Sequence, residues 1–288
     1  MKIGFAGLGV MGAPMARHLV EAGHDVAGFN RSSQKARAWA EASGGRFAAT
    51  VGDAAAGADL FILCVGNDDD VREVVKAALP SMGEGAILVD HTTTSARVAR
   101  EMADLASEQG AFFIDAPVSG GQSGAENGQL SVMAGGDAAA LARAEPVLMS
   151  YAKAVKHMGP AGSGQLTKMV NQIAIAGVVQ GLAEAVHFAQ TAGLDTDAVY
   201  DAVSKGAAQS WQMDNRWKTA AAGQFEFGFA VDWMRKDLGL VLDEARANGA
   251  HLAVTALVDQ FYSEVQAMGG ARWDTSSLAA RLQGLKGQ

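Results

Sequence analysis

The fold is decided near the start of the chain, where residues 2–15 read KIGFAGLGVMGAPM. The apolar run Lys2–Ala6 predicts a buried strand, and a helical pattern over Met11–Ala22 follows it after a short turn. That turn, Gly7-Leu8-Gly9-Val10-Met11-Gly12, has the G-x-G-x-x-G spacing in the required strand-to-helix context. The first glycine permits a tight turn, the second lets a pyrophosphate approach the backbone, and the third allows close helix–strand packing. The stretch therefore predicts a dinucleotide-binding loop.

Short apolar runs alternate with helical patterns over residues 1–160, as expected for a parallel sheet covered on both faces. After residue 164 the patterns are helical throughout, beginning with one long helix predicted at Gln165–Ala192. We therefore predict an α/β fold: a Rossmann-type doubly wound parallel sheet over residues 1–162, then an all-α domain built on a long interdomain helix over residues 163–288. The expected strands are Lys2–Ala6, Asp25–Phe29, Leu60–Val65, Ala86–Asp90 and Ala111–Asp115, extended by Ser131–Ala134 and Ala154–His157. The other expected helices are Val71–Leu79, Ser95–Gln109, Thr196–Ser204, Ala230–Asn248 and Thr255–Met268.

Composition and charge argue against several classes of function. The 288 residues are 49% hydrophobic and carry a formal net charge of −8. That charge repels nucleic-acid phosphates and anionic lipids, so we expect no nucleic-acid partner and no membrane partner. The single cysteine, Cys64, excludes an intramolecular disulfide and a cysteine-based zinc site, and we expect it in the core. No histidines stand at metal-ligand spacing, so we expect no metal.

Two apolar segments could be mistaken for targeting or membrane segments. Residues 3–15 follow a lysine, but their glycines have dinucleotide-loop spacing, so we interpret them as mature structure. Met169–Val186 contains Asn171, Gln172, Gln180 and Glu184, which would be costly in lipid. We therefore expect a buried helix of a soluble protein, and the cysteine-poor composition suits the cytoplasm.

The end of the second predicted strand bears on which dinucleotide is bound. NAD-dependent enzymes usually carry Asp or Glu there, which accepts hydrogen bonds from the ribose 2′-hydroxyl. This chain has Asn30-Arg31-Ser32 instead, and a guanidinium can pair with the 2′-phosphate of NADP. These residues favour NADP over NAD, with a solvated turn arginine as the alternative interpretation.

Two further stretches carry groups suited to a small anion and to proton transfer. Ser119-Gly120-Gly121 follows a predicted strand, and its successive N–H groups can form a carboxylate-binding turn. Lys168 lies one turn into the long helix, after a glycine-rich segment. It is either a surface charge or a buried amine whose lowered pKa suits proton transfer. Asn171 and Gln172 share its helix face, so a polar patch is expected there.

Together these motifs resemble those of the β-hydroxyacid dehydrogenase family, which includes 3-hydroxyisobutyrate dehydrogenase and the tartronate semialdehyde and glyoxylate/succinic semialdehyde reductases. The resemblance runs from residues 7–15, through Asp115–Gly121 and the lead into Lys168, to Lys236-Asp237-Leu238, and so covers nearly the whole chain. It implies an NAD(P)-dependent oxidoreductase that transfers a hydride between a nicotinamide cofactor and a small β-hydroxy acid such as 3-hydroxyisobutyrate.

The resemblance also implies roles for individual residues. Lys168 matches the family's catalytic lysine, the general base in alcohol oxidation and the general acid in the reverse direction. The loop at Ser119, Gly120 and Gly121 matches the one that holds the substrate carboxylate. Cofactor contacts are expected from Thr93 near the nicotinamide ribose, from Lys236 in the helical domain, and from Val65.

The chain departs from the family pattern at two positions. Many members carry Asn four residues after the lysine, whereas this chain has Asn171 at three and Gln172 at four, so both are candidate catalytic partners. His91 stands where many members have a small or apolar residue. A single histidine after a strand is more often a hydrogen-bonded core residue than a catalyst, and we expect the former.

Other functions on the same fold remain open at this stage. The first alternative is an NADPH-dependent glyoxylate/succinic or tartronate semialdehyde reductase. An imine reductase is disfavoured because those enzymes usually replace the lysine, and a non-catalytic cofactor-binding protein is disfavoured by Lys168 together with the Ser-Gly-Gly loop. The long helix is apolar on all sides and needs cover, so a homodimer or homotetramer built on the helical domain is expected.

Overall fold

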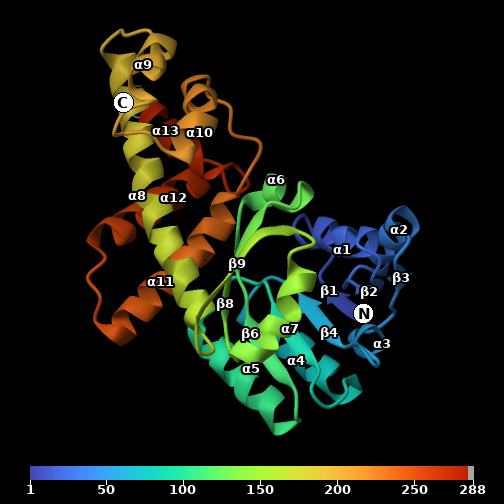
Figure 1. Ribbon diagram of the computed structural model, residues 1–288. Coiled ribbons are helices and arrows are strands. Elements are labelled where there is room, and N and C mark those ends of the chain that lie inside the picture. The colour runs from blue at the N-terminus through green and yellow to red at the C-terminus, as the bar shows by residue number, and fades with distance from the viewer. Residues whose placement is uncertain (285–288) are drawn as a thin grey trace. The chain divides into compact units, whose positions relative to one another are not determined.

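The computed structural model describes residues 1–284 and contains two compact units, unit 1 (Met1–Lys168) and unit 2 (Met169–Gln288) (Figure 1). Unit 1 is an α/β domain and unit 2 is helical, as predicted. The boundary falls inside the long helix α8 (Ser163–Thr191), so that helix begins in one unit and continues as the central helix of the other.

The described part of unit 1 contains a nine-stranded sheet with the strand order β3-β2-β1-β4-β5-β6-β8-β7, and β9 pairs with β8. Strands β1 to β6 are parallel, and β2 and β4 lie on opposite sides of β1, so the direction of winding reverses there. Ligands of doubly wound sheets bind at such a reversal, beyond the carboxyl ends of the strands. The strands are β1 (Lys2–Ala6), β2 (Asp25–Phe29), β3 (Arg46–Phe47), β4 (Leu60–Leu63), β5 (Ile87–Asp90), β6 (Phe112–Asp115), β7 (Val118–Ser119), β8 (Leu130–Gly135) and β9 (Ala152–Gly159).

The far end of the sheet departs from the parallel arrangement of strands β1 to β6. Strand β8 extends the sheet as expected but runs antiparallel to β6 and β7, and β9 runs parallel to β8. Only residues 120–129 connect β7 to β8, which is too short for the crossover that a parallel partner needs. Strand β9 pairs with β8 alone among the described strands, and its Lys153 and Lys156 are exposed.

Apolar side chains cover both faces of the sheet, which explains why the strands read as continuous apolar runs. Successive residues of β4 enter opposite cores: Ile62 packs in the core that includes Met15 of α1, and Leu63 packs in the core that includes Val71 of α4. Cys64 packs partly buried against the first of these cores. The helices of unit 1 are α1 (Gly12–Glu21), α2 (Ser33–Ser43), α3 (Val51–Ala55), α4 (Asp68–Ala78), α5 (Ala96–Glu108), α6 (Gly121–Glu126) and α7 (Ala138–Leu148).

Unit 2 packs its helices around α8. Ala176 and Val179 of α8 share a core with Met234 and Leu238 of α11 and with Tyr262 of α12. By length and composition α8 could cross a membrane, and 44% of its most apolar window is buried inside the protein. The other helices are α9 (Thr196–Val203), α10 (Trp211–Ala221), α11 (Val231–Asn248), α12 (Ala253–Ala267) and α13 (Leu278–Gly284).

Candidate active site

The carboxyl ends of four neighbouring strands are level with one another in unit 1. Ala6 of β1 is in register with Leu63 of β4, Leu63 with Asp90 of β5, and Asp90 with Asp115 of β6. The glycine loop, Val65, Thr93 and the Ser119 loop each follow one of these ends. The topology therefore gathers these sequence-predicted residues at one edge of the sheet.

The glycine loop has the geometry that a dinucleotide requires. Gly7 has a φ of +96°, and a Cβ there would lie 2.1 Å from the carbonyl oxygen of Cys64, so the turn needs glycine. A Cβ on Gly12 would lie 1.8 Å from the carbonyl oxygen of Gly7, because α1 begins so close to the loop. A Cβ on Gly9 would meet no described atom within 4 Å, which leaves room for a pyrophosphate. These residues fit a dinucleotide, whose phosphates the N–H groups at the start of α1 could bind.

The remaining loop residues differ in exposure. The Leu8 side chain is buried in the core, Met11 is half-buried at the N-cap of α1, and Val10 is exposed. The Leu8 N–H donates to Oδ1 of Asn30 at 3.0 Å, which joins the loop to the end of β2. The end of β2 is thereby fixed beside the glycine loop, where the adenosine ribose of a dinucleotide lies.

Arg31 and Ser32 continue from Asn30 at the surface. Ser32 is the N-cap residue of α2. The Arg31 side chain is 83% exposed, and its Nη1 lies 3.3 Å from Oδ1 of Asp70 in the first turn of α4. The guanidinium is therefore accessible to a phosphate, and it has a carboxylate neighbour that the sequence did not reveal.

Gln165, in the first turn of α8, holds the segment that follows β5. Its Oε1 accepts from the Thr94 N–H at 3.0 Å, and its Nε2 donates to the Thr92 carbonyl at 2.7 Å. The Thr92 hydroxyl oxygen accepts from the Val65 N–H at 3.0 Å. Thr93 is half-buried between the two residues that Gln165 holds. Thr93 and Val65, both expected to contact the cofactor, therefore lie on two segments that hydrogen bonds join and hold.

Lys168 lies against the loop expected to hold the substrate carboxylate. Its side chain is 8% exposed, and Nζ donates to the Val118 carbonyl at 2.9 Å. Val118 directly precedes Ser119 in β7, and Gly120 and Gly121 follow with φ of +130° and +61°. Lys168 is therefore buried and not a surface charge, whereas the lowered pKa stays a prediction. A buried amine beside a turn of this kind is suited to exchanging a proton with a small anion bound there.

Asp115 fixes the start of the helix that carries Lys168. Its Oδ1 accepts from the Gly162 N–H at 2.7 Å and its Oδ2 from the Gln165 N–H at 2.9 Å. Burial raises the pKa of Asp115 to about 6, against the opposing effect of these N–H donors. Asp115 therefore joins the end of β6 to the first turn of α8 and limits how far Lys168 can move from the Ser119 loop.

His91 is a buried, hydrogen-bonded core residue, as expected. Its Nδ1 lies 2.6 Å from the Ala116 carbonyl and its Nε2 lies 2.7 Å from the Tyr151 hydroxyl. Because a carbonyl can only accept, Nδ1 carries the proton and Nε2 accepts from Tyr151. Burial lowers the pKa of His91 to about 4, so the ring is neutral at pH 7. The imidazole fixes Ala116, three residues before Ser119.

The other expected site residues lie in unit 2 and bond to one another. Gln172 Nε2 donates to Oδ2 of Asp237 at 2.7 Å, and its Oε1 accepts from Nδ2 of Asn171 at 2.8 Å. Lys236 Nζ lies 3.2 Å from Oδ1 of the same carboxylate. Asp237 is buried and therefore orients both the Gln172 amide and the Lys236 ammonium group.

Sequence reasoning did not assign functions to Asp70, Gln165 or the Asp115 carboxylate. Gln165 and Asp115 contact backbone atoms 71 and 47 residues away, and no sequence pattern specifies such contacts.

Comparisons with known proteins identify the family of the chain. Residues 2–159 match the family described as the NAD binding domain of 6-phosphogluconate dehydrogenase. Residues 162–282 match that described as NAD-binding of NADP-dependent 3-hydroxyisobutyrate dehydrogenase. An uncharacterized oxidoreductase of Shewanella frigidimarina is 62% identical over 285 residues, which cover 98% of each chain.

Two solved structures are similar over nearly their whole length. Mycobacterium tuberculosis 3-hydroxyisobutyrate dehydrogenase with L-serine has a TM-score of 0.89 and 34% identity, covering 97% of this chain and 98% of that one. Psf3 in complex with NADP+ and 2-OPP has a TM-score of 0.87 and 26% identity, covering 97% and 99%. With this fold, site and set of relatives, the chain belongs to the β-hydroxyacid dehydrogenase family and is an NAD(P)-dependent oxidoreductase of the 3-hydroxyisobutyrate dehydrogenase type.

Proposed function

We propose that this chain oxidises a small β-hydroxy acid such as 3-hydroxyisobutyrate, with Lys168 as the general base. The observation that carries the proposal is the 2.9 Å contact between Lys168 Nζ and the carbonyl of Val118, beside Ser119. A carboxylate bound by Ser119, Gly120 and Gly121 would bring the β-hydroxyl group of a short acid near this amine. The proposed carboxylate-binding loop and the proposed proton acceptor are then next to each other.

The proposed chemistry divides between the protein and the cofactor. The bound nicotinamide accepts or donates the hydride. In alcohol oxidation the β-carbon loses that hydride while Lys168 accepts the hydroxyl proton, and a carbonyl forms. In reduction Lys168 returns the proton to the developing alkoxide. Asp115 and Gln165 position the first turn of α8, and hence Lys168, in both directions.

We assign the remaining site residues as follows. The glycine loop, Val65 and Thr93 are proposed to bind the cofactor, and Lys236 is proposed to reach it from unit 2. Asn171 and Gln172 are proposed to orient the substrate, because each takes part in the hydrogen-bonded chain that ends on Asp237. Arg31 is proposed to bind the 2′-phosphate, which makes NADP the favoured cofactor.

A second candidate function is NADPH-dependent reduction of glyoxylate, succinic semialdehyde or tartronate semialdehyde. The exposed Arg31 favours it, because reductases generally draw on NADPH. The same lysine serves as the acid in that direction. An imine reductase is a weaker candidate because Lys168 is present.

A panel of substrates assayed spectrophotometrically with both cofactors tests the proposal. The oxidation panel is 3-hydroxyisobutyrate, glycerate, L-serine and 4-hydroxybutyrate, and the reduction panel is the matching aldehydes together with glyoxylate. We expect the highest kcat/KM with a β-hydroxy acid. Activity confined to 4-hydroxybutyrate or to aldehydes would favour the semialdehyde reductase, and no activity on either panel would contradict both proposals.

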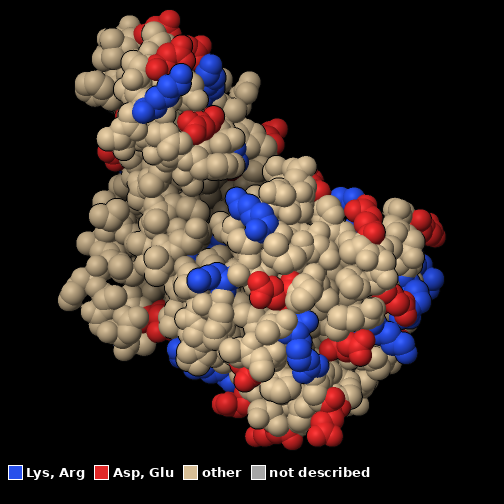
Figure 2. Space-filling model, viewed as in Figure 1, with Lys and Arg blue, Asp and Glu red and all other residues tan. Residues whose placement is uncertain are grey.

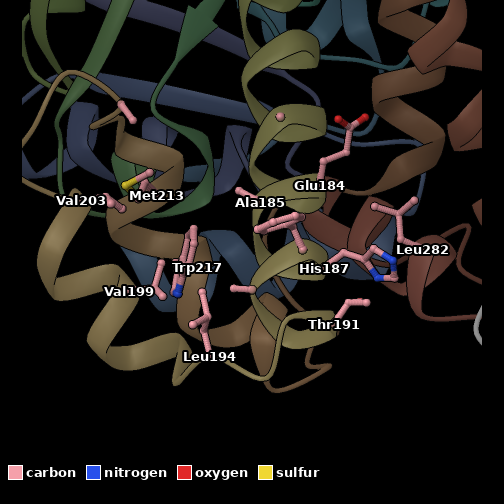
Figure 3. A pocket seen from close by; sticks show the side chains of 14 residues that line it. Glu184, Ala185, His187, Thr191, Leu194, Val199, Val203, Met213, Trp217 and Leu282 are labelled. Atoms are coloured by element: carbon pink, nitrogen blue, oxygen red, sulfur yellow. The ribbon is translucent and has the colours of Figure 1, made fainter.

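We also propose a cytoplasmic homodimer or homotetramer. Six small or apolar residues form an exposed stripe along one side of α8, at a spacing of three or four residues. Beside it is a cavity of about 910 Å³ (Figure 3), with Trp217, Met213 and Val199 on one side of α8 and His187 and Leu282 on the other. A second copy of the chain would cover this surface. The stripe consists of Val170, Ala174, Val178, Gly181, Ala185 and Phe188.

A further inference from the structure

Acidic and basic side chains are mixed over the face of unit 1 that Figure 2 shows. An acidic and a basic side chain are also paired at the proposed 2′-phosphate site. Arg31 Nη1 is 3.3 Å from Oδ1 of Asp70. The two side chains differ in exposure, 83% for Arg31 against 20% for Asp70. The arginine is thus a surface side chain, whereas the carboxylate is largely enclosed.

Hydrogen bonds hold Asp70 in place independently of Arg31. Its Oδ2 accepts from the Gly66 N–H at 3.1 Å, and its own N–H donates to Oδ1 of Asn67 at 3.0 Å. A Cβ on Gly66 would lie 2.5 Å from Oδ2 of Asp70, so the close contact between the Asp70 carboxylate and the backbone of residue 66 depends on that glycine. The neighbouring Asp68 accepts from the Ser95 N–H at 3.0 Å, which fixes this end of α4 to the start of α5. Asp70 is therefore a fixed negative charge beside Arg31.

We propose that Asp70 is a second determinant of cofactor choice, one that competes with the 2′-phosphate of NADPH for Arg31. The proposal rests on the assignment of Arg31 to that phosphate. A 2′-phosphate carries up to two negative charges and must share or displace the carboxylate. NADH has a neutral hydroxyl at the same position and does not meet this competition. Asp70 therefore reduces the preference for NADPH that Arg31 creates, and the chain accepts both cofactors.

The expected size of the effect follows from distance and screening. Two anions bound to one guanidinium lie about 7 Å apart, within the screening length of about 8 Å at physiological salt. The arginine end of the pair is solvent-exposed, so the repulsion is modest, and we expect Asp70 to weaken NADPH binding about fivefold to tenfold. The effect of Asp70 on NADPH binding must decrease as salt is added, because salt screens exposed charges.

The test compares Asp70→Asn with the wild type in full-length protein. Dissociation constants for NADPH and NADH are measured by cofactor fluorescence at low and high salt. Asn keeps an oxygen for the Gly66 N–H, and Asp70→Ser provides a second variant should the first fold poorly. Asp69→Asn is the matched control, because Asp69 is 93% exposed and pairs with Arg72 at 2.9 Å rather than with Arg31.

We expect Asp70→Asn to tighten NADPH binding about fivefold to tenfold at low salt, with NADH binding unchanged within about twofold. Asp69→Asn should leave the ratio of the two constants unchanged. Equal constants for NADPH in Asp70→Asn and the wild type, or an equal gain in Asp69→Asn, would overturn the proposal. Arg31→Ala separates the assignment of Arg31 from the role of Asp70. If this variant leaves NADPH binding unchanged, the assignment of Arg31 to the phosphate fails. If it weakens NADPH binding while Asp70→Asn has no effect, only the role of Asp70 fails.

Discussion

Lys168 Nζ and the carbonyl oxygen of Val118 are 2.9 Å apart, so the amine is held one residue away from Ser119. The contact joins helix α8 to strand β7, 50 residues earlier in the chain. Asp115 and Gln165 fix the helix end of this contact, and the bond from His91 to Ala116 fixes the start of the loop. Hydrogen bonds therefore fix both the helix that carries the proposed proton acceptor and the segment that it contacts.

Replacing Lys168 by Ala should lower kcat by about a hundredfold or more, as loss of a general acid–base usually does. The NADPH dissociation constant should stay within about twofold, because the proposed role is in proton transfer. Steady-state kinetics with the best substrate and a cofactor titration measure the two effects. Lys153→Ala, which removes an exposed lysine of the same unit, is the control. Retention of more than about a tenth of wild-type kcat would exclude Lys168 as the proton-transfer group.

The glycine loop gives a pair of variants with opposite expectations. Gly9→Ala adds a methyl group where no described atom lies within 4 Å, so the free energy of unfolding should change by less than about 1 kcal/mol. NADPH binding should nevertheless weaken by about tenfold or more, because the pyrophosphate would meet that methyl. Gly12→Ala places a Cβ 1.8 Å from the Gly7 carbonyl and should destabilise unit 1 by about 2 kcal/mol. Urea unfolding and cofactor titration separate the two outcomes, and unaltered NADPH binding in Gly9→Ala would count against the loop assignment.

His91 should make the protein sensitive to acid. Its pKa falls from 6.5 in the unfolded chain to about 4 in the folded one, so below pH 6.5 the unfolded state binds the extra proton. The stability that the neutral ring provides is complete above pH 6.5 and is lost as the pH falls toward 4. Between pH 7 and pH 5 the loss should be about 2 kcal/mol.

The variant His91→Gln isolates this contribution, because an amide does not titrate. Denaturant unfolding of variant and wild type is compared at pH 7 and pH 5, and only the difference between the two pH values is used. Asp115, whose pKa is raised to about 6, acts in the opposite direction over pH 3.8–6 and cancels in the comparison. The same pH dependence in His91→Gln and the wild type would rule out His91 as the titrating group.

The exposed stripe on α8 provides a test of assembly. Phe188 is 70% exposed, and Phe188→Glu should shift the protein from a dimer or tetramer toward the 29.7 kDa monomer. Size-exclusion chromatography with light scattering measures the mass directly. Met149→Glu, an exposed apolar residue of unit 1, should have no effect. A wild-type protein that is already a stable, active monomer at micromolar concentration would contradict the proposed assembly.

Local periodicity predicted most of the fold, because the strands and long helices carry their own signals. The strands β1 and β2 were predicted at their observed bounds, and α8 within two residues. The direction of β8 was missed, because an apolar run indicates a strand but not the orientation of its neighbour. The two-residue strands β3 and β7 are too short to show any periodicity.

The candidate site was predictable where it rests on motifs and unpredictable where it rests on tertiary contacts. Gly7, Gly9 and Gly12 have a fixed spacing. The surroundings of Gly7 and Gly12 are crowded and those of Gly9 are open, which matches the roles inferred from the spacing. The neighbour of Arg31 was not foreseen, because Asp70 is 39 residues away and reaches it through the packing of α4. Spacing in the chain does not encode a contact of that kind.

Strand β9 is the edge strand at one end of the sheet in unit 1. It is eight residues long and pairs with β8 alone among the described strands, so one row of its backbone groups is available to another extended chain. The exposed Lys153 and Lys156 place positive charge along this border, which opposes the docking of a second β9 from another molecule. Neutral β-branched residues at these two positions would remove the repulsion between two β9 strands. This edge would then become a site of aggregation during expression. The cost of such a change would appear in the yield of folded protein, even with every residue of the active site intact.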